Sequence, residues 1–200
     1  LWANDHDKNM IPSYRSFFPR AILDTRSIRD IHGSEIPKAD GVIGGPPCQS
    51  WSTAGCRKGI DDPRGQLFYD YIRVVHHVKP LFFVAENVSG LIQGKNREFF
   101  QQILRMMREE GYTVTWKLVN AHHYGVPQDR LRVLMAGYHH SLTKRFVFPA
   151  PLAFRPTLRD AIFDLRNLKI GKSRKVTNHD LFVSGYSPRY MSSNRVRSWH

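Results

Sequence analysis

Apolar and polar positions along the first 140 residues alternate between the patterns of buried strands and of amphipathic helices. The apolar run at 40–44 ends in a Gly-Pro-Pro sequence and predicts a buried strand followed by an abrupt loop. Three apolar residues at helical spacing predict a helix over 66–78, and 81–85 is a second apolar run. A strand, a helix and a strand in this order predict two parallel strands joined by a right-handed crossover.

The pattern continues with elements of both kinds. A helix is predicted over 97–110, and a half-buried strand with alternating polarity over 112–118. The run at 131–138 predicts another strand, an antiparallel neighbour of 112–118 at the edge of the sheet. A short helix is predicted to begin near Thr157. The fold class expected is α/β, with a doubly wound, mostly parallel sheet.

Composition changes near residue 150, where three prolines precede a polar and basic segment. We therefore predict one domain over 1–150 and the beginning of a second, smaller domain over 151–200. The chain carries 30 Lys and Arg against 17 Asp and Glu, a formal net charge of +13. This excess favours a polyanionic partner, most often nucleic acid.

Several classes of protein are excluded by composition. No run of about 18 apolar residues exists, so we expect no membrane span. Two cysteines, Cys48 and Cys56, are too few for a disulfide-rich scaffold or a four-thiolate zinc site and fit a reducing, intracellular location. Three pairs of adjacent histidines point apart on any helix or strand, and we expect no metal.

Two chemically active side chains follow the two predicted parallel strands. Cys48 follows the first strand through a Gly-Gly-Pro-Pro loop, and Glu86 directly follows the second. Carboxyl ends of parallel strands meet at one edge of a sheet, so a thiol and a carboxyl are predicted to face one crevice. A small buried Cys and a Glu that caps a segment or pairs with an arginine are the alternatives at this point.

Three short sequence blocks, two of which contain Cys48 or Glu86, resemble those of a known family. Gly-Pro-Pro-Cys-Gln-Ser-Trp-Ser at 45–52, Glu-Asn-Val at 86–88 and Gln-Asp-Arg-Leu-Arg at 128–132 resemble, in order and spacing, the signature blocks of DNA (cytosine-5) methyltransferases. The stretches 60–68 and 194–199 resemble a narrower branch, the restriction-modification methylases of the HaeIII type that modify GGCC. The resemblance covers essentially the whole chain.

The resemblance implies transfer of a methyl group from S-adenosylmethionine to C5 of a cytosine flipped out of duplex DNA. It assigns Cys48 as the nucleophile that adds to C6 and Glu86 as the partner of N3. Asn87 matches the residue that braces the cysteine loop. Arg132 matches the arginine that holds the cytosine O2, and Arg130 matches its supporting companion.

The resemblance also implies residues for the methyl donor. Asp5 matches the acidic residue that binds the ribose hydroxyls of the donor. Asp24 matches the acidic residue that faces the adenine amino group, with Asp30 close enough to be the alternative. Pro47 and Leu67 match residues that line the donor pocket.

Further residues are expected to contact duplex DNA. Ser52 matches a position beside the phosphate of the flipped nucleotide, and Gln49 and Gln128 belong to the same signature blocks. Arg195 and Arg197 are the candidates for reading guanine edges, since arginine binds guanine O6 and N7 in a bidentate manner. The enzyme is expected to be a monomer in the cytoplasm of a prokaryote.

The sequence departs from the family in lacking a Gly-x-Gly-x-x-Gly loop or an equivalent. We therefore expect the 200 residues to be a fragment that is inactive in isolation. The alternatives are an RNA (tRNA) cytosine-5 methyltransferase, which shares two of the blocks, and a non-catalytic DNA-binding remnant.

Overall fold

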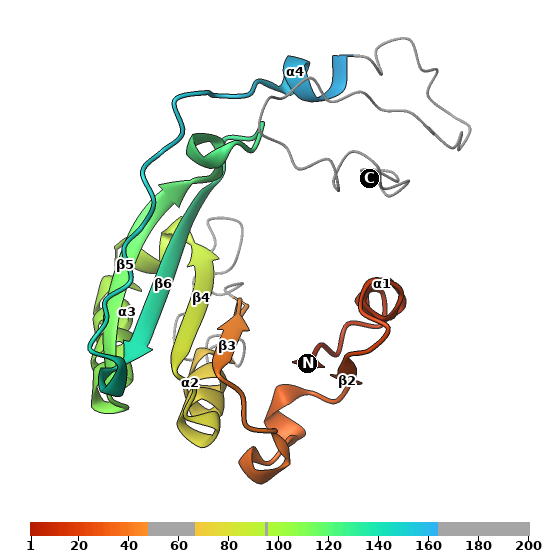
Figure 1. Cartoon of the computed structure of the whole chain (residues 1–200), viewed down its shortest axis with the longest axis vertical. Helices are drawn as coiled ribbons and strands as arrows, with labels where there is room; N and C mark the ends of the chain where they lie inside the picture. The colour runs from red at the N-terminus through yellow and green to blue at the C-terminus, as the bar shows by residue number, and fades with distance from the viewer. Residues whose placement is uncertain (48–66, 95, 164–200) are drawn as a thin grey trace. The chain divides into compact units, whose positions relative to one another are not determined.

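The computed structural model describes residues 1–47, 67–94 and 96–163. Helices and strands alternate along these residues, as the α/β pattern of the sequence predicts (Figure 1). The strands are β1 (Trp2–Asn4), β2 (Ile22–Asp24), β3 (Gly41–Gly44), β4 (Phe82–Val88), β5 (Tyr112–Asn120) and β6 (Leu131–His139), and the α-helices are α1 (Met10–Phe17), α2 (Leu67–Val78), α3 (Asn96–Glu109) and α4 (Leu158–Ile162).

The strands of the described residues form two sheets. Strands β1 and β2 are parallel and make a two-stranded sheet, and the second sheet has the order β3-β4-β6-β5. Strands β3 and β4 are parallel, with Gly44 opposite Ala85, and α2 connects them. The strand, helix and strand predicted around residues 40–85 are therefore confirmed as a unit with parallel strands.

Strand β6 does not lie at the sheet edge, where the sequence pattern placed it. It runs antiparallel to β4 and lies between β4 and β5. Burial explains this order, because Val133 and Met135 of β6 are fully buried, whereas Trp116 and Leu118 of β5 are more than one-third exposed. The strand with solvent-exposed apolar side chains is the one that takes the edge.

The main core lies where α2 and α3 pack against the central strands of the four-stranded sheet. Its buried side chains come from both helices, from β4 and from β6. Along β4, buried and partly exposed positions alternate, as expected for a strand with one face against the core. The largest fully buried members of this core are Phe83, Phe100, Leu91, Ile103, Leu104, Met107 and Met135.

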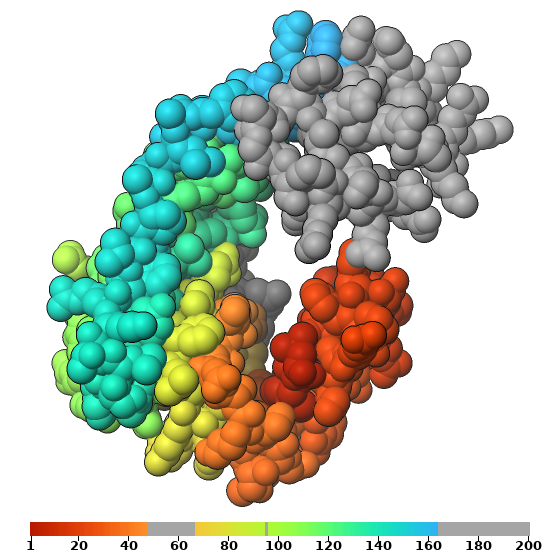
Figure 2. All heavy atoms as spheres, in the orientation of Figure 1, coloured from red at the N-terminus to blue at the C-terminus, as the bar shows by residue number. Residues whose placement is uncertain are grey.

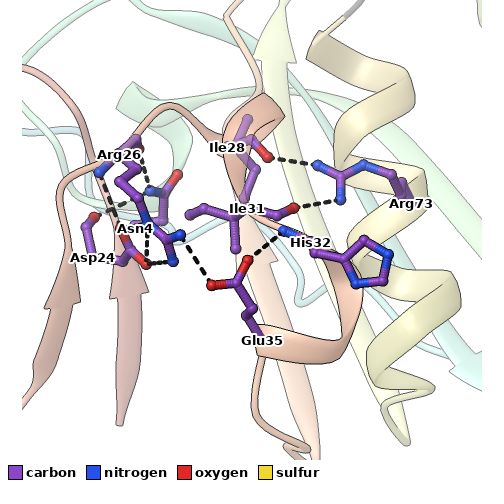
Figure 3. Close-up of polar contacts among 8 residues, drawn as sticks. All are labelled: Asn4, Asp24, Arg26, Ile28, Ile31, His32, Glu35 and Arg73. Atoms are coloured by element: carbon purple, nitrogen blue, oxygen red, sulfur yellow. Dashed lines mark hydrogen bonds and ion pairs between the residues drawn. The ribbon is translucent and has the colours of Figure 1, made fainter.

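A smaller cluster attaches the segment after β2 to α2. Ile31 and Ile36 pack with Val74 and Val78 on a further face of α2. Arg73 of α2 reinforces this contact, because its guanidinium donates hydrogen bonds to the backbone carbonyls of Ile28 and Ile31 (Figure 3). The helix that connects β3 and β4 thus also holds the segment that follows β2.

The first 24 residues carry exposed apolar side chains. Helix α1, red to orange in the space-filling view of Figure 2, buries none of its residues. Phe18, which follows this helix, and Ile22 of β2 are also exposed. Within the described ranges, no helix is long and apolar enough to cross a membrane.

Residue contacts divide the chain into two compact units. The first contains residues 1–118 and 132–148. The described part of the second contains residues 119–131 and 149–163. Within the second unit, the His122 ring lies 3.1 Å from the Pro156 carbonyl, and the Tyr124 hydroxyl donates to the Pro149 carbonyl, so that the segment after residue 148 is held against residues 119–131.

Replacing Arg73 by leucine is expected to lower the free energy of unfolding by about 2 kcal/mol, because two backbone carbonyls lose a charged donor. Arg73→Lys, which keeps the charge but not the fork, is expected to lose less. Urea unfolding followed by tryptophan fluorescence measures both. Arg105→Leu, at an exposed position of α3, is the control; equal losses for Arg73→Leu and Arg105→Leu would contradict the role given to Arg73.

Candidate active site

Glu86 and Arg132 form an ion pair across the central strands. Glu86 lies on β4 opposite Leu134, and Arg132 lies two residues earlier on β6, opposite Val88. Positions two apart on neighbouring strands share a face, which brings the side chains together. Arg132 Nε lies 2.7 Å from Glu86 Oε1, and the Glu86 side chain remains 44% exposed. A partly exposed pair contributes about 0–1 kcal/mol to stability, so its main consequence is a fixed carboxyl orientation.

The sequence pattern placed Glu86 just after its strand, but β4 continues to Val88. Glu86 therefore lies within the ladder between β4 and β6. The ladder continues because β6 supplies a partner for each residue of β4 up to Val88, information that the apolar run at 81–85 does not contain. The carboxyl is consequently attached to a paired strand rather than to a loop.

Asn87 holds the chain at the start of the Pro-Pro-Cys segment. Its side chain is only 2% exposed. The amide Nδ2 donates to the Pro46 carbonyl at 3.1 Å, and Oδ1 accepts the Val88 N–H at 2.9 Å. A Cβ added to Gly45 would lie 3.4 Å from Glu86 Oε2, so the backbone before Pro46 passes beside the carboxyl. Cys48 follows Pro46 by two residues and lies outside the described residues.

Gln128 and Arg130 are exposed and belong to the second compact unit. Their loop is organised by Asn120, which the sequence analysis did not identify. The Asn120 Oδ1 accepts the backbone N–H of Arg130 at 3.0 Å and that of His122 at 3.1 Å, and its Nδ2 donates to Asp129. An asparagine at the end of a strand is a common capping residue, and this was the only signal in the sequence.

Asp5 and Asp24 are brought together by the parallel pairing of β1 and β2. The Asp5 N–H donates to the Asp24 carbonyl at 3.2 Å. Asp5 Oδ1 accepts the Asp7 N–H at 2.9 Å, and among the described residues no partner contacts its Oδ2. Asp30 is exposed in a 3-10 helix at Ile28–Asp30.

The Asp24 carboxylate is already engaged by Arg26. Arg26 Nη2 lies 2.7 Å from Asp24 Oδ2, and Arg26 also pairs with Glu35 at 3.0 Å (Figure 3). The hydrogen bonds from the Arg26 side chain and backbone lower the pKa of Asp24 below its ordinary value. Asn4 completes the arrangement by donating to the carbonyls of Asp24 and Arg26. Sequence reasoning missed this network, because it joins residues from three separate segments.

The remaining predicted residues are placed as follows. Pro47 is exposed beside the buried Pro46, and Leu67 is the partly buried first residue of α2. Among the described residues, no group of three or more His, Cys, Asp or Glu side chains could hold a metal ion. Four predicted DNA-contacting residues lie outside the described ranges, namely Gln49, Ser52, Arg195 and Arg197.

Several known proteins are similar to this chain. A family model for C-5 cytosine-specific DNA methylase matches residues 1–199. Type II methyltransferase M.FnuDI of Fusobacterium nucleatum is 44% identical over 209 residues, which cover 98% of this chain and 60% of the relative. Type II methyltransferase M.MthTI of Methanothermobacter thermautotrophicus is 46% identical over 207 residues, which cover 100% of this chain and 62% of the relative.

A solved structure gives the same result for the fold. The crystal structure of a DNA modification methyltransferase encoded within an E. coli prophage matches with a TM-score of 0.68 and 29% sequence identity, over 81% of this chain and 47% of that chain. The predicted fold class is thereby confirmed. The chain spans about 60% of the length of the curated relatives described above. Since the family model matches nearly every residue and both relatives align over almost the whole sequence, this chain belongs to the C-5 cytosine-specific DNA methylase family.

Proposed function

We propose that this chain carries the catalytic residues of an enzyme that transfers a methyl group from S-adenosylmethionine to C5 of a cytosine flipped out of duplex DNA. The observation that carries the proposal is the Glu86–Arg132 ion pair, beside which the backbone of Gly45 leads toward Cys48. Family membership supports the substrate class. The names of the relatives, type II methyltransferases, support a restriction-modification system.

The chemistry requires a thiolate and an acid beside one pyrimidine. Cytosine C5 is a weak nucleophile until a thiolate adds to C6, forming the S–C6 bond and moving the ring electrons toward C5 and N3. We assign the thiolate to Cys48 and the proton shared with N3 to Glu86. Glu86 Oε1 faces Arg132, so Oε2, on the side of Gly45, is the oxygen assigned to N3. When a base later removes the C5 proton, the C5–C6 double bond reforms and the thiolate leaves.

The neighbouring residues are assigned to orientation. Arg132 directs Nε to Glu86, and its guanidinium is assigned to the cytosine O2, as the resemblance implies. Asn87 fixes the Pro46 carbonyl and thereby the start of the loop that contains Cys48. Arg130 is assigned a supporting role in a loop whose backbone is held by Asn120.

The methyl donor is assigned to the carboxyl ends of β1 and β2. When bound, S-adenosylmethionine supplies an electrophilic methyl group carried on a sulfonium. Asp5 suits its ribose hydroxyls, because a carboxylate accepts hydrogen bonds from a diol and one of its oxygens accepts only a backbone N–H. Asp24 is assigned to the adenine amino group, and its carboxylate also accepts hydrogen bonds from the backbone N–H, Nε and Nη2 of Arg26. Pro47 and Leu67 are assigned to the walls of the pocket.

We further assign residues 1–150 to a catalytic domain and 151–200 to the beginning of a target-recognition domain. The recognition site is assigned as GGCC-like on the resemblance of 60–68 and 194–199 to HaeIII-type methylases. Gln49, Ser52, Gln128, Arg195 and Arg197 are assigned to DNA contacts. The enzyme is proposed to act as a monomer in the cytoplasm.

The 200 residues alone are proposed to be inactive, because they contain no Gly-x-Gly-x-x-Gly loop or an equivalent for the methyl donor. Catalytic measurements are therefore made on the full-length protein. The family model describes DNA methylases and therefore favours neither the RNA-modifying nor the non-catalytic alternative. They are separated from the proposed function by the experiments below.

Cys48→Ser is expected to abolish covalent capture of a duplex that contains 5-fluorocytosine in the target site. A hydroxyl is a far weaker nucleophile than a thiolate, and fluorine at C5 prevents the release step. Denaturing gel electrophoresis with the donor present measures the adduct. Cys56→Ser, the other cysteine of the chain, is expected to form the adduct as the unaltered protein does. A normal adduct with Cys48→Ser, or none with the unaltered protein, would count against the enzyme.

Glu86→Gln is expected to lower kcat by about 10²- to 10⁴-fold, because an amide cannot transfer a proton to N3. The dissociation constant for duplex DNA is expected to stay within about threefold, since the side chain remains isosteric. Single-turnover methyl transfer and DNA titration measure the two quantities. Glu98→Gln, at an exposed position in the first turn of α3, is the matched control and should leave both unchanged. A kcat within fivefold for Glu86→Gln would remove Glu86 from the mechanism.

A GGCC duplex is expected to be methylated far faster than a GCGC duplex, and tRNA is expected to be a poor competitor and acceptor. Arg195→Ala or Arg197→Ala should reduce this discrimination by about 1–3 kcal/mol, the value of a bidentate arginine–guanine contact. Lys169→Ala, which removes one positive charge from the same basic segment, is the control and should change binding to all duplexes alike. Preferential methylation of tRNA would support the RNA alternative, and equal rates on both duplexes would refute the site.

A further inference from the structure

Tyr71 of α2 is a buried tyrosine between the helix and the two parallel strands. Its hydroxyl lies 2.9 Å from the carbonyl oxygen of Val84 on β4 and 3.4 Å from that of Val42 on β3. The ring contacts Phe68 and Phe83 edge-on. A phenylalanine would suit these aromatic neighbours equally well. The hydroxyl is therefore the feature to explain, because a buried hydroxyl is costly unless it is hydrogen-bonded.

The ring of Tyr71 also occupies the space above Gly44. A Cβ added to Gly44 would lie 2.7 Å from Tyr71 Cε2, closer than two carbon atoms can approach. Gly44 is the last residue of β3, and the chain continues from it into the Pro-Pro-Cys segment. Tyr71 thus contacts β3 at its end and β4 two residues before Glu86.

Two side chains tie β3 to β4 near their carboxyl ends. Tyr71 does so from the helix side, and Asn87 does so one step further along, through the Pro46 carbonyl. Backbone pairing alone ends with Gly44 opposite Ala85. Beyond that point Asn87 holds Pro46, whereas Tyr71 contacts the two strands just before their pairing ends.

We propose that Tyr71 is a positioning residue for methyl transfer, holding β3 and β4 in the register that places the segment before Cys48 beside Glu86. This inference rests on the proposed function. The hydroxyl acts as a neutral donor, since burial raises the pKa of Tyr71 well above its ordinary value. A hydrogen bond of this kind affects the alignment of reacting groups, to which rates are far more sensitive than binding is.

The chain contains a matched control in Tyr112. This residue begins β5, is buried, and contacts the same Phe83 ring. Its hydroxyl donates to the Pro80 carbonyl at 2.8 Å, just before β4 begins. Tyr112→Phe therefore removes one buried tyrosine hydrogen bond from the opposite end of β4, away from Glu86.

The test compares Tyr71→Phe with Tyr112→Phe in the full-length protein. Both variants are expected to lower the urea midpoint to a similar extent. Tyr71→Phe is expected to reduce kcat and the rate of 5-fluorocytosine adduct formation by about tenfold or more, with the KM values for donor and DNA within twofold. Tyr112→Phe is expected to keep kcat within twofold.

A second variant approaches the same contact from the strand. Gly44→Ala is expected to displace the Tyr71 ring and to lower kcat to a similar degree. Combined with Tyr71→Phe, it should add less than its separate effect, because the hydrogen bond is already lost. Fully multiplicative effects on kcat would overturn the shared mechanism.

Hydrogen exchange separates failure of this inference from failure of the proposed function. Tyr71→Phe is expected to accelerate exchange of backbone amides in 41–45 and 84–88, whereas Tyr112→Phe should not. If the unaltered protein methylates DNA but Tyr71→Phe keeps its kcat, or loses no more than Tyr112→Phe, the positioning role is wrong. If the unaltered protein transfers no methyl group to DNA, the proposed function fails, and with it any role of Tyr71 in that reaction.

Discussion

The hydrogen bond from Asn87 to the Pro46 carbonyl joins two strands whose ends carry the candidate chemistry. Parallel pairing of β3 and β4 stops at Gly44 and Ala85. Beyond that pair, no ladder hydrogen bond holds the described residues 45–47, and a side chain does so instead. An amide suits this task, because it donates to one carbonyl and accepts one N–H while remaining neutral in a buried setting.

Successive residues of β4 face opposite sides of the sheet, so that the residues that pack in the core alternate with those that face the candidate site. Phe83, Ala85 and Asn87 face the core, and the positions between them face the other side of the sheet. Glu86 is on that second side, where Arg132 reaches it from β6. Adjacent residues of one strand can therefore have opposite environments, one fully buried and one accessible to a substrate. A shift of the strand by one residue would exchange the two.

Local sequence patterns predicted the helices and strands well, but they could not predict the contacts between segments that are distant in the sequence. The helix predicted over 66–78 is found at Leu67–Val78, because the spacing of apolar residues is a property of the segment itself. The position of β6 inside the sheet depends on burial of the strand against both neighbours, which no segment encodes alone. The resemblance supplied the site residues as a set, but not the pairing of Asp24 with Arg26 or the organisation of the loop at Arg130 by Asn120.

Helix α2 contacts both β3 and β4 and the segment that follows β2. One face packs on the sheet core, Tyr71 reaches β3 and β4, and Arg73 holds the segment after β2 that is continuous with Asp24. Val74 and Val78 pack against that same segment. The helix is 12 residues long, so these contacts lie on one short element. A single helix thus contacts both the strands assigned to cytosine and the segment that follows the strands assigned to the methyl donor, and a direct transfer between two bound molecules requires such alignment.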